Sequence, residues 1–82
     1  MNERINVGYR IIKVIALTHT EFVLGEKTTD SGTKYVTWRC NNRTDYYYGH
    51  YIENLDLALL DLYERAQDEV VFIISQLREN LK

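Results

Sequence analysis

The chain has 82 residues, and ten Lys and Arg side chains against twelve Asp and Glu give it a net charge of −2. A chain of this length forms one domain, and this charge argues against a general polyanion binder that is held by bulk electrostatics. Cys40 is the only cysteine, so an intramolecular disulfide is excluded and a reducing, cytoplasmic location is expected.

The ends of the chain carry no sign of export or of a second domain. Residues 1–7 lack the apolar run of a signal peptide, and the longest apolar stretch, residues 70–74, is too short to span a bilayer. No proline, internal repeat or low-complexity tract marks a linker. We therefore expect a single domain over residues 1–82 and no membrane partner.

Four strands are expected in the first two thirds of the chain. Residues 9–51 are rich in β-branched and aromatic side chains, and turn chemistry interrupts them at residues 18–19, 28–32 and 41–42. Because short links join antiparallel neighbours, the pattern predicts an antiparallel β-meander of three to four strands. The expected strands are about 9–17, 21–27, 33–40 and 44–51.

The hydrophobic period changes after Tyr51. Apolar side chains then recur at intervals of three and four residues, which is the stripe of an amphipathic helix: Leu59, Tyr63, Ala66, Val70, Ile73, Leu77 and Leu81. Asn54 can cap this helix, which we expect over about residues 55–80. The predicted fold class is therefore α+β, with the meander packed against one long C-terminal helix. Such a helix is about 39 Å long and a strand of eight residues about 27 Å, so the helix should overhang the sheet or break near residues 67–68.

The second half of this helix has more apolar surface than one stripe provides. Residues 70–74 are apolar around nearly the whole circumference, and something must cover them. Either this turn packs under the sheet edge of its own chain, or it forms a helix-mediated homodimer. The candidate oligomer contact consists of Val70, Val71, Phe72 and Ile74.

The two faces of the sheet follow from the expected turn at residues 42–43. This turn sets Trp38 opposite Tyr47, and the face that receives the helix is expected to hold Val36, Trp38, Cys40 and Tyr47 with Phe22 and Leu24. The opposite face should carry tyrosines and an arginine. A slip of one residue would exchange the two faces. The candidate interaction surface is Tyr35, Arg39, Tyr46, Tyr48 and His50.

No arrangement of residues typical of catalysis or of cofactor binding is found. Cys40, His19 and His50 lack metal-ligand spacing, and the four glycines are isolated rather than grouped in a phosphate-binding loop. In the expected register Cys40 and His50 point to opposite faces, which argues against a nucleophilic pair. We expect a protein that is not an enzyme, with no catalytic residues, no metal site and no cofactor.

Three aromatic segments support a resemblance. Residues 21–25 (E-F-V-L-G), 35–38 (Y-V-T-W) and 46–51 (Y-Y-Y-G-H-Y), followed by a Leu-rich helix, resemble small uncharacterised proteins carried on mobile elements of Gram-positive bacteria. The resemblance covers about residues 9–66 and brings no assigned activity. It implies a prophage or a conjugative element, where small acidic proteins often act by binding a host or element protein.

Two functions fit these expectations. The first is a non-enzymatic protein-interaction module that self-associates, as a homodimer, and binds an unidentified protein partner, because a small chain carries excess apolar surface. The alternative is a nucleic-acid-binding domain, since tyrosines and arginines on a sheet also stack bases. Tyrosines that simply suit a solvated sheet surface are a third explanation of the same pattern.

Overall fold

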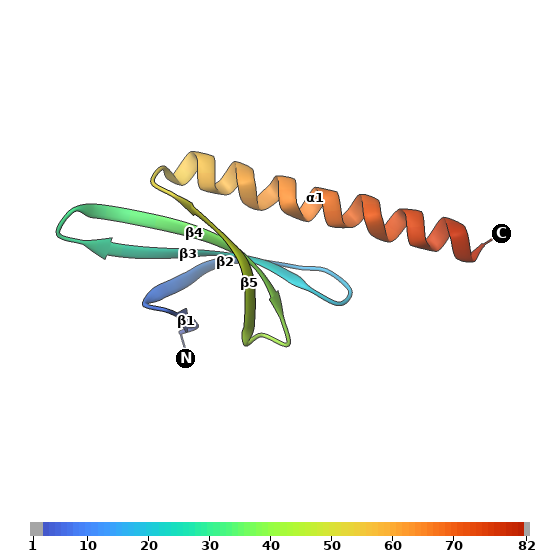
Figure 1. Ribbon diagram of the computed structural model, residues 1–82, viewed down its shortest axis with the longest axis horizontal. Coiled ribbons are helices and arrows are strands. Elements are labelled where there is room, and N and C mark those ends of the chain that lie inside the picture. The colour runs from blue at the N-terminus through green and yellow to red at the C-terminus, as the bar shows by residue number, and fades with distance from the viewer. Residues whose placement is uncertain (1–2, 82) are drawn as a thin grey trace.

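The computed structural model describes residues 3–81, which fold into one antiparallel sheet and one C-terminal helix (Figure 1). The sheet order follows the chain, β1-β2-β3-β4-β5, so every strand pairs with its neighbour in sequence. The α+β class and the meander agree with the sequence, but the sheet has five strands rather than three or four. The elements are β1 (Ile5–Asn6), β2 (Tyr9–Ala16), β3 (Glu21–Thr29), β4 (Gly32–Asn41), β5 (Asp45–Ile52) and α1 (Leu55–Asn80).

The additional strand is β1, which precedes the first expected strand at about residue 9. Its two residues pair with the beginning of β2 across a turn in which Val7 and Gly8 have φ of 42° and 85°. A strand of two residues is too short for a hydrophobic period, so no sequence pattern marks it. The expected domain, residues 1–82, also contains residues 1, 2 and 82, which lie outside the described part of the chain.

The turn between β4 and β5 differs from the expected one. Asn41 pairs with Asp45, so residues 42–44 form the loop, and Asn42 and Arg43 adopt φ of 55° and 64°. The loop thus holds one residue more than the predicted turn, and every residue at the start of β5 is displaced by one position. Tyr47 pairs with Arg39, not with Trp38. The predicted register of this hairpin was therefore wrong.

A second irregularity lies further along the same pair of strands. The register shifts between Thr37 and Arg39, because Thr37 pairs with His50 while Arg39 pairs with Tyr47. β5 therefore contains one extra residue here, and Tyr48 has φ of 54°. This is a β-bulge, which bends its strand and increases the local twist. β2 carries a similar shift between Ile11 and Lys13.

The helix covers a face of the sheet that combines residues from both of the expected faces. Phe22 and Leu24 of β3 form one buried core with three residues of α1, Ala58, Leu62 and Ala66. Of the residues expected on this face, Val36, Trp38 and Cys40 lie on the other one, because they alternate with Thr37 and Arg39 along β4. The assignment of faces was therefore wrong for β4, although Phe22 and Leu24 do meet the helix.

The opposite face of the sheet forms a second core. The sheet curls (Figure 1), and its buried residues here are Tyr9, Val23, Val36, Trp38 and Cys40. The Trp38 ring meets the ring of Tyr9 edge to face, with centroids 5.8 Å apart. Gly25 makes this approach possible, because a Cβ at that position would lie 2.9 Å from Cβ of Tyr9 and 3.1 Å from Cζ3 of Trp38. The sheet thus covers its own second apolar face without a second helix.

The helix continues well past the end of the sheet. α1 runs without a break over 26 residues, about 39 Å, and its C-terminal half extends beyond the β2–β3 turn (Figure 1). Asn54 caps it, since its side-chain oxygen accepts a hydrogen bond from the backbone N–H of Leu57 at 3.1 Å. The molecule is therefore elongated, with extents of 55 × 27 × 20 Å. Its radius of gyration is 14.3 Å, against about 11.7 Å for a compact domain of this length.

Candidate interaction surfaces

The residues of the candidate interaction surface do not form one face. Tyr35 packs against the core beneath the helix, and Arg39 and His50 form ion pairs with α1. Tyr46 lies on the opposite side, where its ring is 5.5 Å from that of Trp38. Tyr48 is 77% exposed at the bulge of β5. The predicted surface is therefore divided: Tyr46 lies at the second core, whereas Arg39, Tyr48 and His50 line one groove beside the helix.

A polar network joins the helix to the middle of the sheet. The buried hydroxyl of Thr37 donates a hydrogen bond to Oδ2 of Asp61 at 2.5 Å and accepts one from Nη1 of Arg65 at 3.0 Å. Nδ1 of His50 lies 2.8 Å from the same Asp61 oxygen. One turn further along, Nη1 of Arg39 pairs with Oε1 of Glu69 at 3.1 Å. These contacts fix the side of α1 that faces β4 and β5.

The network holds Asp61 in its ionised form. Burial raises the pKa of this carboxyl, but the hydrogen bonds from Thr37 and His50 and the positive charges of His50 and Arg65 outweigh burial, so the pKa is lower than usual. Burial lowers the pKa of Arg65, and Asp61 opposes that effect. Each charge in this group has an opposite partner, which is the arrangement of a structural contact rather than of a free acid or base.

Replacing Thr37 by valine tests this network. Valine keeps the shape of threonine but removes the hydroxyl that donates to Asp61 and accepts from Arg65, so we expect a loss of about 1–3 kcal/mol in the free energy of unfolding at pH 7. Because the pKa of Asp61 is lower in the folded state, its ionised form stabilises the fold above about pH 3.9, and this contribution disappears as the pH falls through the folded-state pKa. The difference in the free energy of unfolding between Thr37→Val and the wild type should therefore become smaller at acidic pH.

Urea denaturation at neutral and at acidic pH measures both effects. Thr28→Val is the matched control, since Thr28 is exposed and its hydroxyl contacts only the partly exposed Thr33 among the bonds described. A deficit of Thr37→Val that stays constant down to pH 2 would contradict the assigned role of Asp61.

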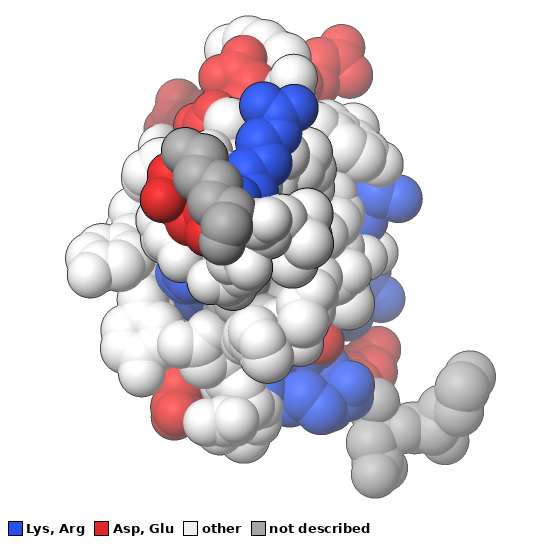
Figure 2. Space-filling model, turned by 90° about the vertical axis from the view of Figure 1, so that its right-hand side faces the viewer, with Lys and Arg blue, Asp and Glu red and all other residues white. Residues whose placement is uncertain are grey.

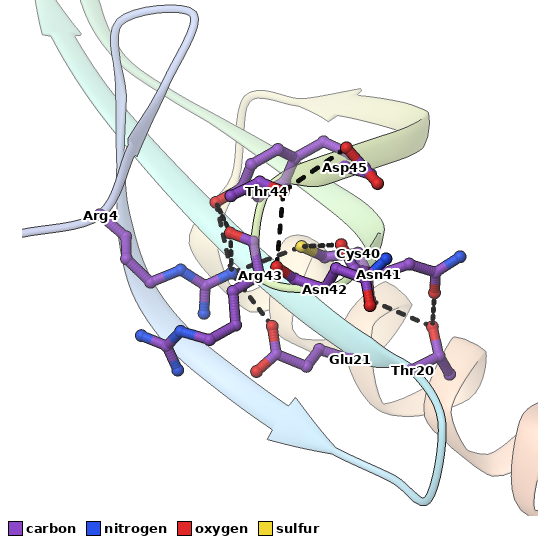
Figure 3. Close-up of polar contacts among 10 residues, drawn as sticks. Arg4, Thr20, Glu21, Cys40, Asn41, Asn42, Arg43, Thr44 and Asp45 are labelled. Atoms are coloured by element: carbon purple, nitrogen blue, oxygen red, sulfur yellow. Dashed lines mark hydrogen bonds and ion pairs between the residues drawn. The ribbon is translucent and has the colours of Figure 1, made fainter.

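The second polar cluster closes the curled face (Figure 3). Arg4, in the segment before β1, reaches across the sheet and donates from Nη2 to Oε1 of Glu21 at 3.0 Å and to the hydroxyl of Tyr46 at 3.3 Å. The same nitrogen lies 3.3 Å from the carbonyl oxygen of Arg43 and 3.4 Å from Sγ of Cys40. Arg4 and Glu21 are each only 17% exposed. This contact holds the N-terminal segment over the second core.

Cys40 does not have the surroundings of a reactive thiol. Its side chain is fully buried, and burial raises the pKa of the thiol despite the nearby positive charge of Arg4. A raised pKa disfavours the thiolate, which is the nucleophile. Among residues 3–81 no group of three or more His, Cys, Asp and Glu side chains is placed to hold a metal ion.

An open groove lies beside the helix, next to the bulge of β5. Phe22, Arg39, Tyr48, Glu69 and Phe72 are among its lining residues. Its charges are largely neutralised, because Arg39 pairs with Glu69 and His50 pairs with Asp61. The groove therefore combines paired charges with two exposed aromatic side chains, Tyr48 and Phe72.

The clearest unsatisfied surface lies on the outer side of α1. Val70, Val71, Phe72 and Ile74 are 39%, 57%, 56% and 44% exposed. Figure 2 looks onto this end of the molecule, where uncharged atoms cover much of the surface around the helix. The sheet touches a different line of side chains, marked by Ala58, Leu62 and Ala66. The helix is thus turned so that much of its apolar stripe faces solvent.

Comparison with protein-family models, curated proteins and solved structures finds no match to this chain. No helix in the part of the chain that the structure describes combines the length and the apolar character that a transmembrane segment requires. The candidate surfaces are therefore judged on their own geometry.

Proposed function

We propose that this protein is a non-enzymatic protein-interaction module that self-associates through the exposed apolar side of α1. The observation that carries the proposal is the free half of the helix, where apolar residues surround the axis and the chain's own sheet does not cover them. Large exposed apolar patches on small proteins mark interaction sites. The setting implied by the resemblance, a mobile element whose small proteins bind other proteins, agrees with such a role.

The total exposed area supports the same conclusion. The chain exposes 5944 Å², whereas a compact monomer of its mass, 9.7 kDa, exposes about 5100 Å². The excess of about 800 Å² equals the area that one partner buries in a standard interface. One self-association interface would thus bring the exposed area to the value that is usual for this mass.

The alternative function, binding of nucleic acid, has less support. It required Arg39, Tyr46 and Tyr48 on one sheet face, but Tyr46 packs against the second core, while Arg39 and Tyr48 line the groove beside the helix. Arg4, Arg10 and Arg39 all form ion pairs with glutamates, which reduces their availability for phosphates.

Light scattering after size exclusion tests the proposed self-association. We expect twice the chain mass of 9.7 kDa for the wild type. Ile74→Asp should weaken the dimer at least about 100-fold, because it places an unpaired charge in a buried contact. Ser75→Asp is the matched control, since it adds the same charge on the neighbouring outer position and should leave the dimer intact. A wild type that stays monomeric at high concentration would overturn the proposal.

A further inference from the structure

The exposed side of α1 carries a regular heptad pattern. Its positions are spaced by three and four residues in strict alternation: Leu60, Tyr63, Gln67, Val70, Ile74, Leu77 and Leu81. The six apolar members are 39–85% exposed, so the fold of the single chain leaves much of their surface uncovered. We call these seven residues the outer seam. A strict period of 3.5 residues is the signature of a helix that pairs with another helix in a left-handed coiled coil.

The outer seam is separate from the side of α1 that meets the sheet. At 100° per residue its centre lies about 110° around the helix from Leu62, which is fully buried against the sheet. A second helix can therefore lie along the seam without displacing the sheet. Lys13 borders the seam, with Nζ 5.8 Å from the ring centre of Tyr63.

We propose that two copies of this chain associate through an antiparallel coiled coil of their outer seams, with the twofold axis level with residue 72 of each helix. This inference rests on the proposed self-association and adds its partner, orientation and register. In an antiparallel pair each a position faces a d position of the other helix. In the register that we propose, Tyr63 lies against Leu81 of the second copy, Gln67 against Leu77, and Val70 against Ile74.

The charges beside the seam agree with this register. It brings Glu64 of one copy next to Arg78 of the other, and symmetry forms this pair twice. None of the ion pairs found among residues 3–81 involves Glu64 or Arg78, so both are available. Val71 meets its own counterpart at the twofold axis, which covers a side chain that is 57% exposed in the single chain.

A parallel pair would be less favourable. Its flanking contacts would join Ile73 to Arg78 and Leu59 to Glu64, neither of which is a pair of opposite charges. In the antiparallel arrangement the overlap runs over residues 63–81, about 27 Å. The two sheets then lie at opposite ends of the helix pair.

Charge reversal tests the register. Glu64→Arg and Arg78→Glu, each alone, should weaken the dimer roughly tenfold, because each creates two like-charge contacts. The double variant restores opposite charges and should return to within about threefold of the wild type. Sedimentation equilibrium gives the dissociation constants. If the two substitutions weaken the dimer additively, so that the double variant has a higher dissociation constant than either single variant, the register is wrong.

Distances between spin labels test the orientation. Asp56→Cys and Ser75→Cys place one label on each copy, while Cys40 stays unlabelled because it is buried in the folded chain. The antiparallel pair predicts about 50 Å between the labels at residue 56 and about 15 Å at residue 75. A dimer with short distances at both positions is parallel, which refutes this inference and leaves the self-association standing. A monomeric wild type refutes both.

Discussion

Replacing Leu62 by alanine is expected to lower the free energy of unfolding by about 2–5 kcal/mol, a large share of the total for a small domain. The side chain of Leu62 has no exposed surface and packs with Phe22, Leu24, Ala58 and Ala66. Its removal leaves a cavity beneath the helix, and the flanking alanines are too small to fill it. Urea denaturation followed by the fluorescence of Trp38, the only tryptophan, measures the loss.

Leu60→Ala is the matched control for Leu62→Ala. Leu60 lies two residues earlier on the same helix, is 54% exposed, and falls outside the overlap of the proposed helix pair. We expect it to change the stability by no more than about 0.5 kcal/mol. Equal losses at the two positions would mean that α1 packs on the sheet in a different rotation about its axis.

Trp38→Ala should lower the free energy of unfolding as much as Leu62→Ala, although Trp38 lies in the second core and not under the helix. The indole is 4% exposed and packs edge to face against Tyr9 and Tyr46 in the second core. We expect a loss of about 3–5 kcal/mol, because truncation of a buried aromatic residue combines lost burial with a cavity.

Circular dichroism during urea denaturation measures the effect of Trp38→Ala without the tryptophan signal. Tyr48→Ala is the control, since Tyr48 is an aromatic residue of the same sheet but 77% exposed. A loss below about 1 kcal/mol for Trp38→Ala would show that the curled face of the sheet contributes little to stability.

The order of elements could be predicted from the sequence, while the faces of the sheet could not. Turn residues and the change of period at Tyr51 mark the strands and the helix. The register of β4 and β5 depends on one additional loop residue, Thr44, and on a bulge at Tyr48. Neither the extra loop residue nor the bulge can be recognised from the alternation of apolar and polar residues. Each one moves the strand residues that follow it to the opposite face of the sheet.

The rotation of the helix could not be predicted from its apolar stripe either. Two members of the expected stripe, Leu59 and Ala66, do pack in the core under the helix, but Tyr63 and Val70 are 50% and 39% exposed. The stripe also lacked Ala58 and Leu62, which the sheet buries. Ala58 and Ala66, one turn before and one turn after Leu62, have small side chains that allow the helix to approach the sheet closely. When a helix is apolar on more than one side, periodicity alone does not separate the side that meets the sheet from the side that meets a partner.

One signal could have located the polar network. Asp61, Arg65 and Glu69 follow each other at intervals of four, so they form a single charged line along the helix. Thr37 and Arg39 stand on one face of β4, and pairing that face with the charged line would have placed the helix correctly. The candidate residues Arg39 and His50 would then have been predicted as internal contacts rather than as a free surface.

The central strand β3 sets a limit on how far this sequence can vary. Phe22, Val23 and Leu24 are consecutive and buried, with Phe22 and Leu24 in the core under the helix and Val23 in the core of the curled face. Because this segment is apolar on both sides, none of its three positions is solvated, and a polar residue at any of them would be costly. Among homologous sequences, substitutions should therefore be most frequent at the exposed positions of β5 and α1 and rarest at Phe22, Val23 and Leu24.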